Sequence, residues 1–401
     1  MNLKVKRWIP LLLSACLLGL IVALSTIPKP QPPAAEPPKA TADEAETEMR
    51  GVWVTYMELS MEYEADKSEQ AFREKFERIA AVAKNAGFNA LIVQVRPFCD
   101  ALYDSAYFPA SHVLSGKQGD ESGYDALAIM CETGKRLGLA VHAWLNPYRV
   151  TADNVPESLS ESNPFRQHPE WCIETESGVI LDPSNENARK LIENGVREIV
   201  ERYDVAGIQF DDYFYPPDIG DLDNEAYEAY LQTDIPTKMN RADWRELNVN
   251  ILLSEIYMLV HSSGKQVVFG ISPQGNLGNN ESLSADVVSW CGVHGFADYI
   301  CPQLYFSPDN PSLGFEEALE SWCALDRAKD VKLYIGLAGY KAQTDADEGT
   351  WLSREDILAE EFNILKKNQK VDGMLLYSYS SLADEEKAAE IKHLTDRLGK
   401  H

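Results

Sequence analysis

The feature that most constrains the fold is a regular alternation of short and long apolar segments from residue 51 to residue 398. The short runs are rich in β-branched and aromatic residues and are bounded by polar, Gly or Pro residues, which predicts strands. They span residues 51–55, 89–95, 140–145, 206–211, 266–271, 299–304, 332–337 and 373–377. The longer stretches have apolar residues at helical spacing and predict helices at 68–86, 124–137, 186–203, 243–263, 286–291, 315–326, 354–367 and 383–398.

Eight strand–helix units in this length predict an α/β fold, the (β/α)8 TIM barrel. An open doubly wound sheet would have fewer strands and usually a Gly-rich phosphate turn, and no G-x-G-x-x-G follows a predicted strand here. Long loops follow the second strand, at residues 97–123, and the third, at residues 146–185. The latter includes a predicted hairpin around Glu176-Ser177-Gly178. Long loops at the C-terminal face of a barrel build substrate clefts, so we expect the site there.

The N-terminal region predicts targeting rather than a folded domain. Three basic residues precede an uncharged apolar run at residues 8–27, whose length matches a bilayer span of about 20 residues. We therefore divide the chain into a membrane anchor or signal segment (1–27), a Pro/Ala/Glu-rich linker (28–48) and the barrel (49–401). We favour a retained anchor; a cleaved signal, or a lipoprotein attached through Cys16, is the alternative. Each of these places the barrel outside the cytoplasm, anchored to the membrane or secreted.

Charge and cysteine content restrict the partners. The 37 Lys and Arg against 63 Asp and Glu give a net charge of −26. Such an acidic protein would repel nucleic acid, and it must bind any anionic wall polymer through local contacts. The barrel region contains six cysteines, which form either disulfides or buried free thiols: Cys99, Cys131, Cys172, Cys291, Cys301 and Cys323. None lies in a C-x-x-C motif, so neither a zinc ribbon nor a redox motif is predicted.

The alternation of side chains along the fourth strand gives the candidate catalytic residues. Successive residues of a barrel strand point to the interior and to the helix layer in turn. In the segment GIQFDD at 207–212, this rule turns Asp211 inward near the C-terminal mouth and places Asp212 just beyond the strand. Because charged groups are seldom buried without a partner, packing explains an inward carboxylate poorly. We therefore predict that Asp211 and Asp212 are catalytic.

The same rule predicts substrate-binding residues at the ends of other strands: Gln94, Arg96, His142, Trp144, Asn146, Gln303, Tyr305 and Tyr377. Aromatic faces that stack on sugar rings, beside amides and carboxylates, are typical of a carbohydrate site. Structural roles are also open for two of these residues. Arg96 can pair with Asp211 as a structural bridge that lowers its pKa, and His142 can be a hydrogen-bonded core histidine.

Several motifs resemble the glycosyl-hydrolase-like family ten. They are Met49-Arg50-Gly51-Val52-Trp53-Val54, residues 89–97, His142-Ala143-Trp144-Leu145-Asn146-Pro147-Tyr148-Arg149, Leu181-Asp182-Pro183, GIQFDDYFYP at 207–216, Gly270-Ile271-Ser272-Pro273 and Pro302-Gln303-Leu304-Tyr305. The resemblance runs from about Met49 to Ser380. It implies a TIM-barrel glycosidase of the bacterial envelope. The family includes a lipoprotein that cleaves peptidoglycan glycan strands stripped of their stem peptides, so a carbohydrate polymer is the implied partner.

Glycoside hydrolysis usually needs an acid and a second carboxylate. Asp212 is nearest to Asp211, while Glu58, Asp100 and Asp182 follow the first three strands. No glutamate ends the fourth, sixth or seventh strand, which counts against a two-glutamate retaining scheme.

Adjacent aspartates fit substrate-assisted hydrolysis better, in which the sugar's own 2-acetamido oxygen attacks the anomeric carbon. The pair is similar to that of enzymes that remove N-acetylglucosamine from proteins. We expect Asp211 to hold the acetamido group and Asp212 to protonate the leaving group. Gln303, Tyr305 and Asn146 would hydrogen-bond the sugar, and Arg96 or Arg149 would bind a muramic lactyl carboxylate.

Two rival functions remain. A metal-dependent hydrolase or deacetylase would need clustered ligands, and the chain lacks H-E-x-x-H and a strand-borne H-x-H. His142, Asp211 and Asp212 could hold one ion, but we expect no metal and no cofactor. The other rival is a carbohydrate-binding barrel without catalysis.

Overall fold

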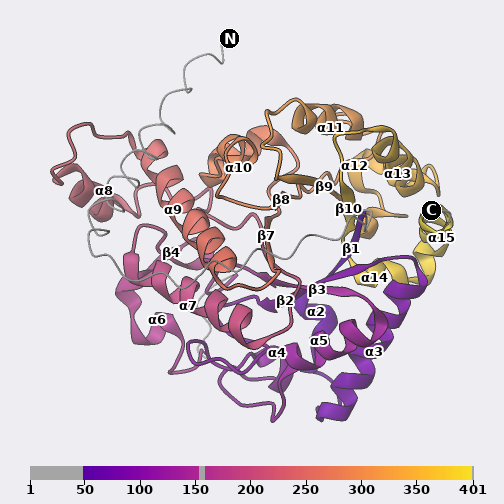
Figure 1. Ribbon diagram of the computed structural model, residues 1–401, viewed down its shortest axis with the longest axis horizontal. Coiled ribbons are helices and arrows are strands. Elements are labelled where there is room, and N and C mark those ends of the chain that lie inside the picture. Colours follow the sequence, from indigo (N-terminus) through magenta and orange to yellow (C-terminus); the bar gives the residue numbers. More distant parts are fainter. Residues whose placement is uncertain (1–47, 153–158, 400–401) are drawn as a thin grey trace, which may run out of the picture. The chain divides into compact units, whose positions relative to one another are not determined.

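The computed structural model describes residues 48–152 and 159–399 (Figure 1). Eight strands form a closed, parallel barrel: β1 (Met49–Val54), β2 (Ala90–Arg96), β3 (Ala140–Leu145), β6 (Gly207–Phe210), β7 (Val268–Ile271), β8 (Tyr299–Ile300), β9 (Lys332–Leu337) and β10 (Gly373–Leu376). The last strand pairs with the first, with Gly373 opposite Met49, and this pairing closes the ring. The predicted (β/α)8 barrel is confirmed.

A ring of helices surrounds the barrel (Figure 1). The helices that follow the eight strands are α3 (Glu69–Asn85), α5 (Ala126–Leu137), α7 (Glu186–Arg202), α9 (Arg241–Ser262), α10 (Val287–Gly292), α11 (Phe315–Cys323), α13 (Ile357–Lys367) and α15 (Ala388–Leu398). Helix α7 shows why they form. Asn185 caps its first turn by accepting from two backbone N–H groups, and Ala188, Ile192, Val196 and Ile199 are buried at helical spacing.

Shorter elements occupy the loops. The short helices are α2 (Tyr56–Leu59), α4 (His112–Ser115), α6 (Pro164–Gln167), α8 (Asn224–Leu231), α12 (Ala346–Gly349) and α14 (Tyr379–Ala383). The 3₁₀ turns are η1 (Pro169–Trp171), η2 (Leu277–Leu283), η3 (Gly339–Lys341), η4 (Thr350–Leu352) and η5 (Glu385–Lys387). Among the described residues, no helix is long and apolar enough to cross a bilayer. The predicted anchor or signal (1–27) and residues 28–47 of the predicted linker lie outside the described residues.

Large inward side chains fill the barrel. A buried cluster inside it consists of Trp53, Ala90, Ile92, Trp144, Tyr299, Cys301 and Leu375. Tyr299 fits because β7 has Gly270 beside it: a Cβ there would lie 1.9 Å from Cζ of the tyrosine ring. The Tyr299 hydroxyl donates to Oε1 of Gln209 at 3.1 Å and accepts from Nδ1 of His142 at 3.2 Å. The interior is thus a packed core, and a site can exist only at its open end.

The predicted hairpin in the loop after β3 is confirmed: β4 (Cys172–Thr175) pairs antiparallel with β5 (Gly178–Leu181). Its turn contacts a third long loop, which follows β6 and carries α8. The backbone N–H and hydroxyl of Ser177 donate to Asp218 at 3.1 and 2.8 Å. The two loops are therefore joined at one side of the barrel mouth. All six cysteines of the barrel are free thiols.

Candidate active site

Strand β6 ends at Phe210 and places the two aspartates at the C-terminal mouth of the barrel. Their side chains are buried, with Asp211 3% and Asp212 8% exposed. Oδ2 of Asp211 accepts from Nε1 of Trp144 at 3.2 Å and from Nδ2 of Asn146. Its other oxygen accepts the backbone N–H of Tyr213 at 3.3 Å. A tryptophan and an asparagine from one neighbouring strand therefore hold Asp211.

The direction of these hydrogen bonds is fixed by a chain of amides. The backbone N–H of Tyr56 can only donate, and it donates to Oε1 of Gln94 at 3.1 Å. Nε2 of Gln94 then donates to Oδ1 of Asn146 at 2.6 Å. This leaves Nδ2 of Asn146 to face Asp211. The predicted residues Gln94, Trp144 and Asn146 thus come together at the pair, although Gln94 contacts it only through Asn146.

Two glutamine amides hold Asp212. Nε2 of Gln303 donates to Oδ1 of Asp212 at 3.1 Å and to the backbone carbonyl of Ser272 at 3.0 Å. Nε2 of Gln274 donates to the other oxygen. Gln274 is absent from the residues predicted above. Alternation along β7 could have found it, because Gly270 faces inward and Gln274 lies four residues later.

Burial changes the protonation of the pair. It raises the pKa of Asp211 to about 7, the neighbouring Asp212 carboxylate adds to this rise, and Arg149 opposes it. Burial also raises the pKa of Asp212, against the two glutamine donors. Two adjacent carboxylates in a poorly solvated site cannot both ionise cheaply. The pair therefore retains one proton near neutral pH and offers one acid and one carboxylate.

Aromatic side chains lie on two sides of the mouth. Tyr305, Tyr340 and Tyr377 contact one another, with ring centroids 5.7 to 5.8 Å apart, and belong to the β8–β10 side. On the β2–β6 side, the Arg149 guanidinium lies 4.7 Å from the Phe98 ring centroid and 4.9 Å from that of Tyr213. Rings of this kind can stack on sugar faces.

Arg96 points away from the site, contrary to the prediction. The register of β2 against β3 shifts between Gln94 and Arg96, so that Arg96 pairs with Leu145. This bulge reverses the alternation. The Arg96 guanidinium lies 4.6 Å from the Phe108 ring centroid, and a Cβ at Gly195 of α7 would lie 2.3 Å from its Nη1. Within the described residues it forms no ion pair with Asp211, and its two Nη atoms have no hydrogen-bond partner.

His142 lies deeper in the barrel, beside Gly207 at the start of β6. Burial lowers its pKa to about 4, so the ring is neutral, and its Nδ1 bonds Tyr299. The structure therefore places it as a core histidine. No group of three His, Cys, Asp or Glu side chains that could hold a metal ion occurs in residues 48–152 and 159–399.

The other carboxylates considered as partners of Asp211 have local roles. Glu58 accepts the backbone N–H of Thr55 and the hydroxyl of Ser378, both at 2.6 Å, and the backbone N–H of Ser380. It thus ties the end of β1 to the end of β10. Asp182 accepts from the backbone N–H and the hydroxyl of Ser184 at 2.8 and 2.7 Å.

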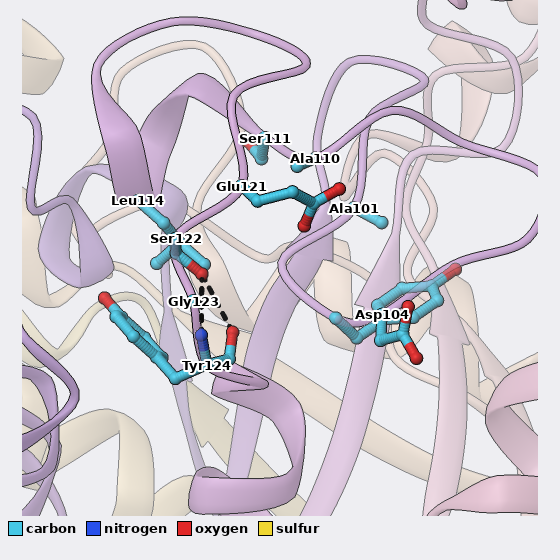
Figure 2. Close-up of a pocket in the computed structure, with 10 residues that line it drawn as sticks. Ala101, Asp104, Ala110, Ser111, Leu114, Glu121, Ser122, Gly123 and Tyr124 are labelled. Carbon is cyan, nitrogen blue, oxygen red and sulfur yellow. Dashed lines mark hydrogen bonds between the residues drawn. The ribbon is translucent and has the colours of Figure 1, made fainter.

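Asp100 is fully buried in the loop after β2, where it bonds His112 and Gln118. A separate hollow of about 260 Å³ adjoins this loop. Figure 2 shows its Glu121 and Asp104 carboxylates, and Ser122 bonded to the main chain of Tyr124. The hollow does not include the aspartate pair.

The chain is similar to known proteins in both sequence and fold. The family model described as glycosyl hydrolase-like 10 matches residues 48–353. The chain is 32% identical over 358 residues to glycosyl hydrolase YngK of Bacillus subtilis, covering 84% of this chain and 69% of YngK. It is 29% identical over 437 residues to glycosyl hydrolase DigH of Escherichia coli K12, covering 99% and 98% of the two chains.

Solved structures share the fold at low sequence identity. The glycoside hydrolase domain of PgaB (BpsB) from Bordetella bronchiseptica superposes with a TM-score of 0.59 at 13% identity, covering 86% of this chain and 98% of that domain. An endo-1,4-β-mannanase from Rhizomucor miehei gives a TM-score of 0.52 at 10% identity, covering 90% and 97%.

Proposed function

Because this chain belongs to the glycosyl hydrolase-like 10 family, we propose that it hydrolyses an N-acetylated glycan of the bacterial envelope, such as peptidoglycan strands freed of their peptides. The observation that carries the proposal is the buried Asp211–Asp212 pair, which retains one proton and is held by four side-chain donors. A proton donor beside a carboxylate is what cleavage of a glycosidic bond requires. The relatives YngK and DigH are both named glycosyl hydrolases.

In the proposed mechanism, the 2-acetamido oxygen of the sugar attacks the anomeric carbon while the bond to the leaving oxygen breaks. The acetamido N–H donates to Asp211, and because this hydrogen bond is stronger to an ionised carboxylate, it favours the arrangement with the proton on Asp212. Asp212 passes that proton to the leaving oxygen. The deprotonated Asp212 then takes a proton from the water that opens the cyclic intermediate, which restores the pair.

The remaining contacts of the site suit such a substrate. Tyr305, Tyr340 and Tyr377 provide rings for a sugar face, with Tyr340 41% exposed. Because Arg96 points away from the site, Arg149 is the arginine that we assign to binding a lactyl carboxylate. Its Nε donates to the carbonyl of Pro97 at 2.9 Å, and it forms no ion pair with another described residue. Asn146 is already bonded to Asp211 and Gln94, so we assign it to positioning rather than to the sugar. We also propose, from residues 1–27, that the barrel works outside the cytoplasm.

The test compares Asp211→Asn and Asp212→Asn on two substrates. One is purified peptide-free glycan strands, with new reducing ends identified by mass spectrometry. The other is a nitrophenyl N-acetylglycosaminide, whose leaving group needs no protonation. We expect both variants to lose at least about 100-fold in kcat on strands. Only Asp212→Asn should keep activity on the aryl glycoside. Wild-type turnover of strands by Asp212→Asn would refute the acid assignment. Strand binding by the wild type without new reducing ends would favour a non-catalytic barrel.

A further inference from the structure

A row of side chains leads away from the aspartate pair along the β2–β6 side of the mouth. Tyr213 follows Asp212 directly, and Arg149 lies between the rings of Tyr213 and Phe98. Beyond Phe98, at 5.7 Å between ring centroids, lies His112 of α4. We call these four residues the cationic row. The row is open to ligand, because Tyr213 is 54% exposed and the His112 side chain 32% exposed.

Two members of the row carry or can carry positive charge. Arg149 forms no ion pair with another described residue. His112 bonds the fully buried Asp100 through Nδ1 at 3.2 Å, so Nε2 is the ring nitrogen left for a ligand, and the side chain is 32% exposed. This hydrogen bond is the main cause that raises the pKa of His112; burial opposes it, and the charges of Asp100 and Glu62 add to it. Two lysines also lie near α4: Lys67, whose Nζ donates to the carbonyl of Ser115, and Lys117, which pairs with Asp120.

We propose that the cationic row binds an anionic glycan that carries carboxylates on alternate sugars, with Arg149 binding one carboxylate and His112 the next. The inference rests on the proposed function and specifies its substrate. Because Phe98 lies between them at 4.7 and 5.7 Å, the two cations are at most about 10 Å apart, a span that a disaccharide bridges.

The charge of the whole protein makes local cations necessary for such a ligand. With a net charge of −26, the protein repels a polyanion at long range, so attraction must come from short-range pairs. Beyond His112 the surface turns acidic again, since Ser111 and Leu114 border the hollow that Glu121 and Asp104 line (Figure 2). The row therefore ends at His112.

The test measures KM on peptide-free glycan strands and on the same strands after reduction of their carboxyl groups to alcohols. His112→Gln keeps a side-chain donor for Asp100 and removes the charge. At pH 5.5 we expect it to raise KM on native strands about fivefold, with kcat unchanged and with no effect on reduced strands. His261→Gln is the matched control, because His261 also pairs with an aspartate, Asp298, near the opposite end of the barrel. An equal KM increase on both substrates, or none on either, would overturn the proposal.

Asp100→Asn gives a second test, the pH dependence of KM, which would not change if His112 had only a structural role. It keeps the hydrogen bond but removes the charge that favours protonated His112. The pH at which KM for native strands begins to rise should therefore move toward acid, together with the NMR titration of His112. An unmoved pH profile contradicts the assignment.

Binding separates this inference from the proposed function. If the wild type releases no reducing ends, calorimetry can still measure the binding of native and reduced strands and so test the cationic row. Weaker binding of native strands alone by His112→Gln supports the row, whatever the fate of catalysis; equal binding of both strands by the wild type rejects it.

Discussion

Asn146 donates its side-chain amide to Asp211, although it could equally have presented its oxygen. Gln94 sets the orientation of the Asn146 amide. Its Oε1 accepts the backbone N–H of Tyr56, so only its Nε2 is free to donate to Oδ1 of Asn146. The ionised form of Asp211 is thus stabilised by a hydrogen-bond direction that starts at the backbone of Tyr56.

Gln94→Glu should lower the activity of the site, although residue 94 does not contact the substrate. The new carboxylate can still accept from Tyr56, but it has no N–H for Asn146, which then turns its oxygen toward Asp211. We expect kcat to fall about tenfold with KM little changed, and the pKa on the alkaline side of the kcat profile to rise. Steady-state kinetics across pH measures both. Gln369→Glu adds the same charge at an exposed position and should behave as wild type.

Activity should decline as the pH rises above about 7, because the aspartate pair then loses the proton that it gives to the leaving oxygen. Arg149 lowers the pKa of both aspartates, so Arg149→Gln should increase their proton affinity. We expect the alkaline limb of the kcat profile to move up by roughly half to one pH unit. A downward shift would contradict the arrangement of charges described here.

Glu361 should make the fold less stable as pH rises. It is fully buried on α13 with no hydrogen-bond partner for either oxygen, and Glu390 of α15, Glu360 and Asp347 oppose its ionisation while Lys341 favours it weakly. Its folded pKa is therefore raised, so stability is full below the ordinary pKa of about 4.5 and falls as pH rises toward the folded value. Glu361→Gln should raise the free energy of unfolding clearly at pH 8 and hardly at pH 4. Urea titrations at both pH values test this, with exposed Glu355→Gln as control.

Gly270→Ala should destabilise the barrel by about 3 kcal/mol or more. The added methyl group would overlap the ring of Tyr299, which belongs to the neighbouring strand β8 and is held by its hydrogen bond to Gln209 of β6. Thermal unfolding measures the loss. Gly278→Ala is the matched control, since its Cβ would meet nothing closer than 3.5 Å. Restored stability in Gly270→Ala combined with Tyr299→Leu would show that the overlap is the cause.

Most of the barrel can be predicted from the sequence, because period-two strands and period-3.6 helices leave different apolar patterns. Strands β3 and β9 begin and end where that pattern begins and ends. Helix α8 leaves no such pattern, since none of its residues is buried. Alternation along the strands also brings Trp144, Asn146 and Gln303 to the aspartate pair, while their roles in binding and catalysis stay predictions.

The prediction for Arg96 is wrong because β2 contains a bulge. A bulge depends on pairing between two strands, so the sequence of β2 alone does not reveal it. His112 was out of reach for a related reason: its contact with Asp100 joins two parts of one long loop, where no periodicity fixes the direction of a side chain.

The closure of the barrel by β1 and β10 affects how the protein matures. Glu58 receives two of its hydrogen bonds from Ser378 and Ser380, which lie more than 300 positions later in the chain. The mouth therefore cannot be completed until almost the whole polypeptide has emerged from the ribosome. Contacts this distant in sequence also slow folding. A chain terminated before β10 would lack both the final strand and Tyr377, so its barrel would stay open and its mouth incomplete.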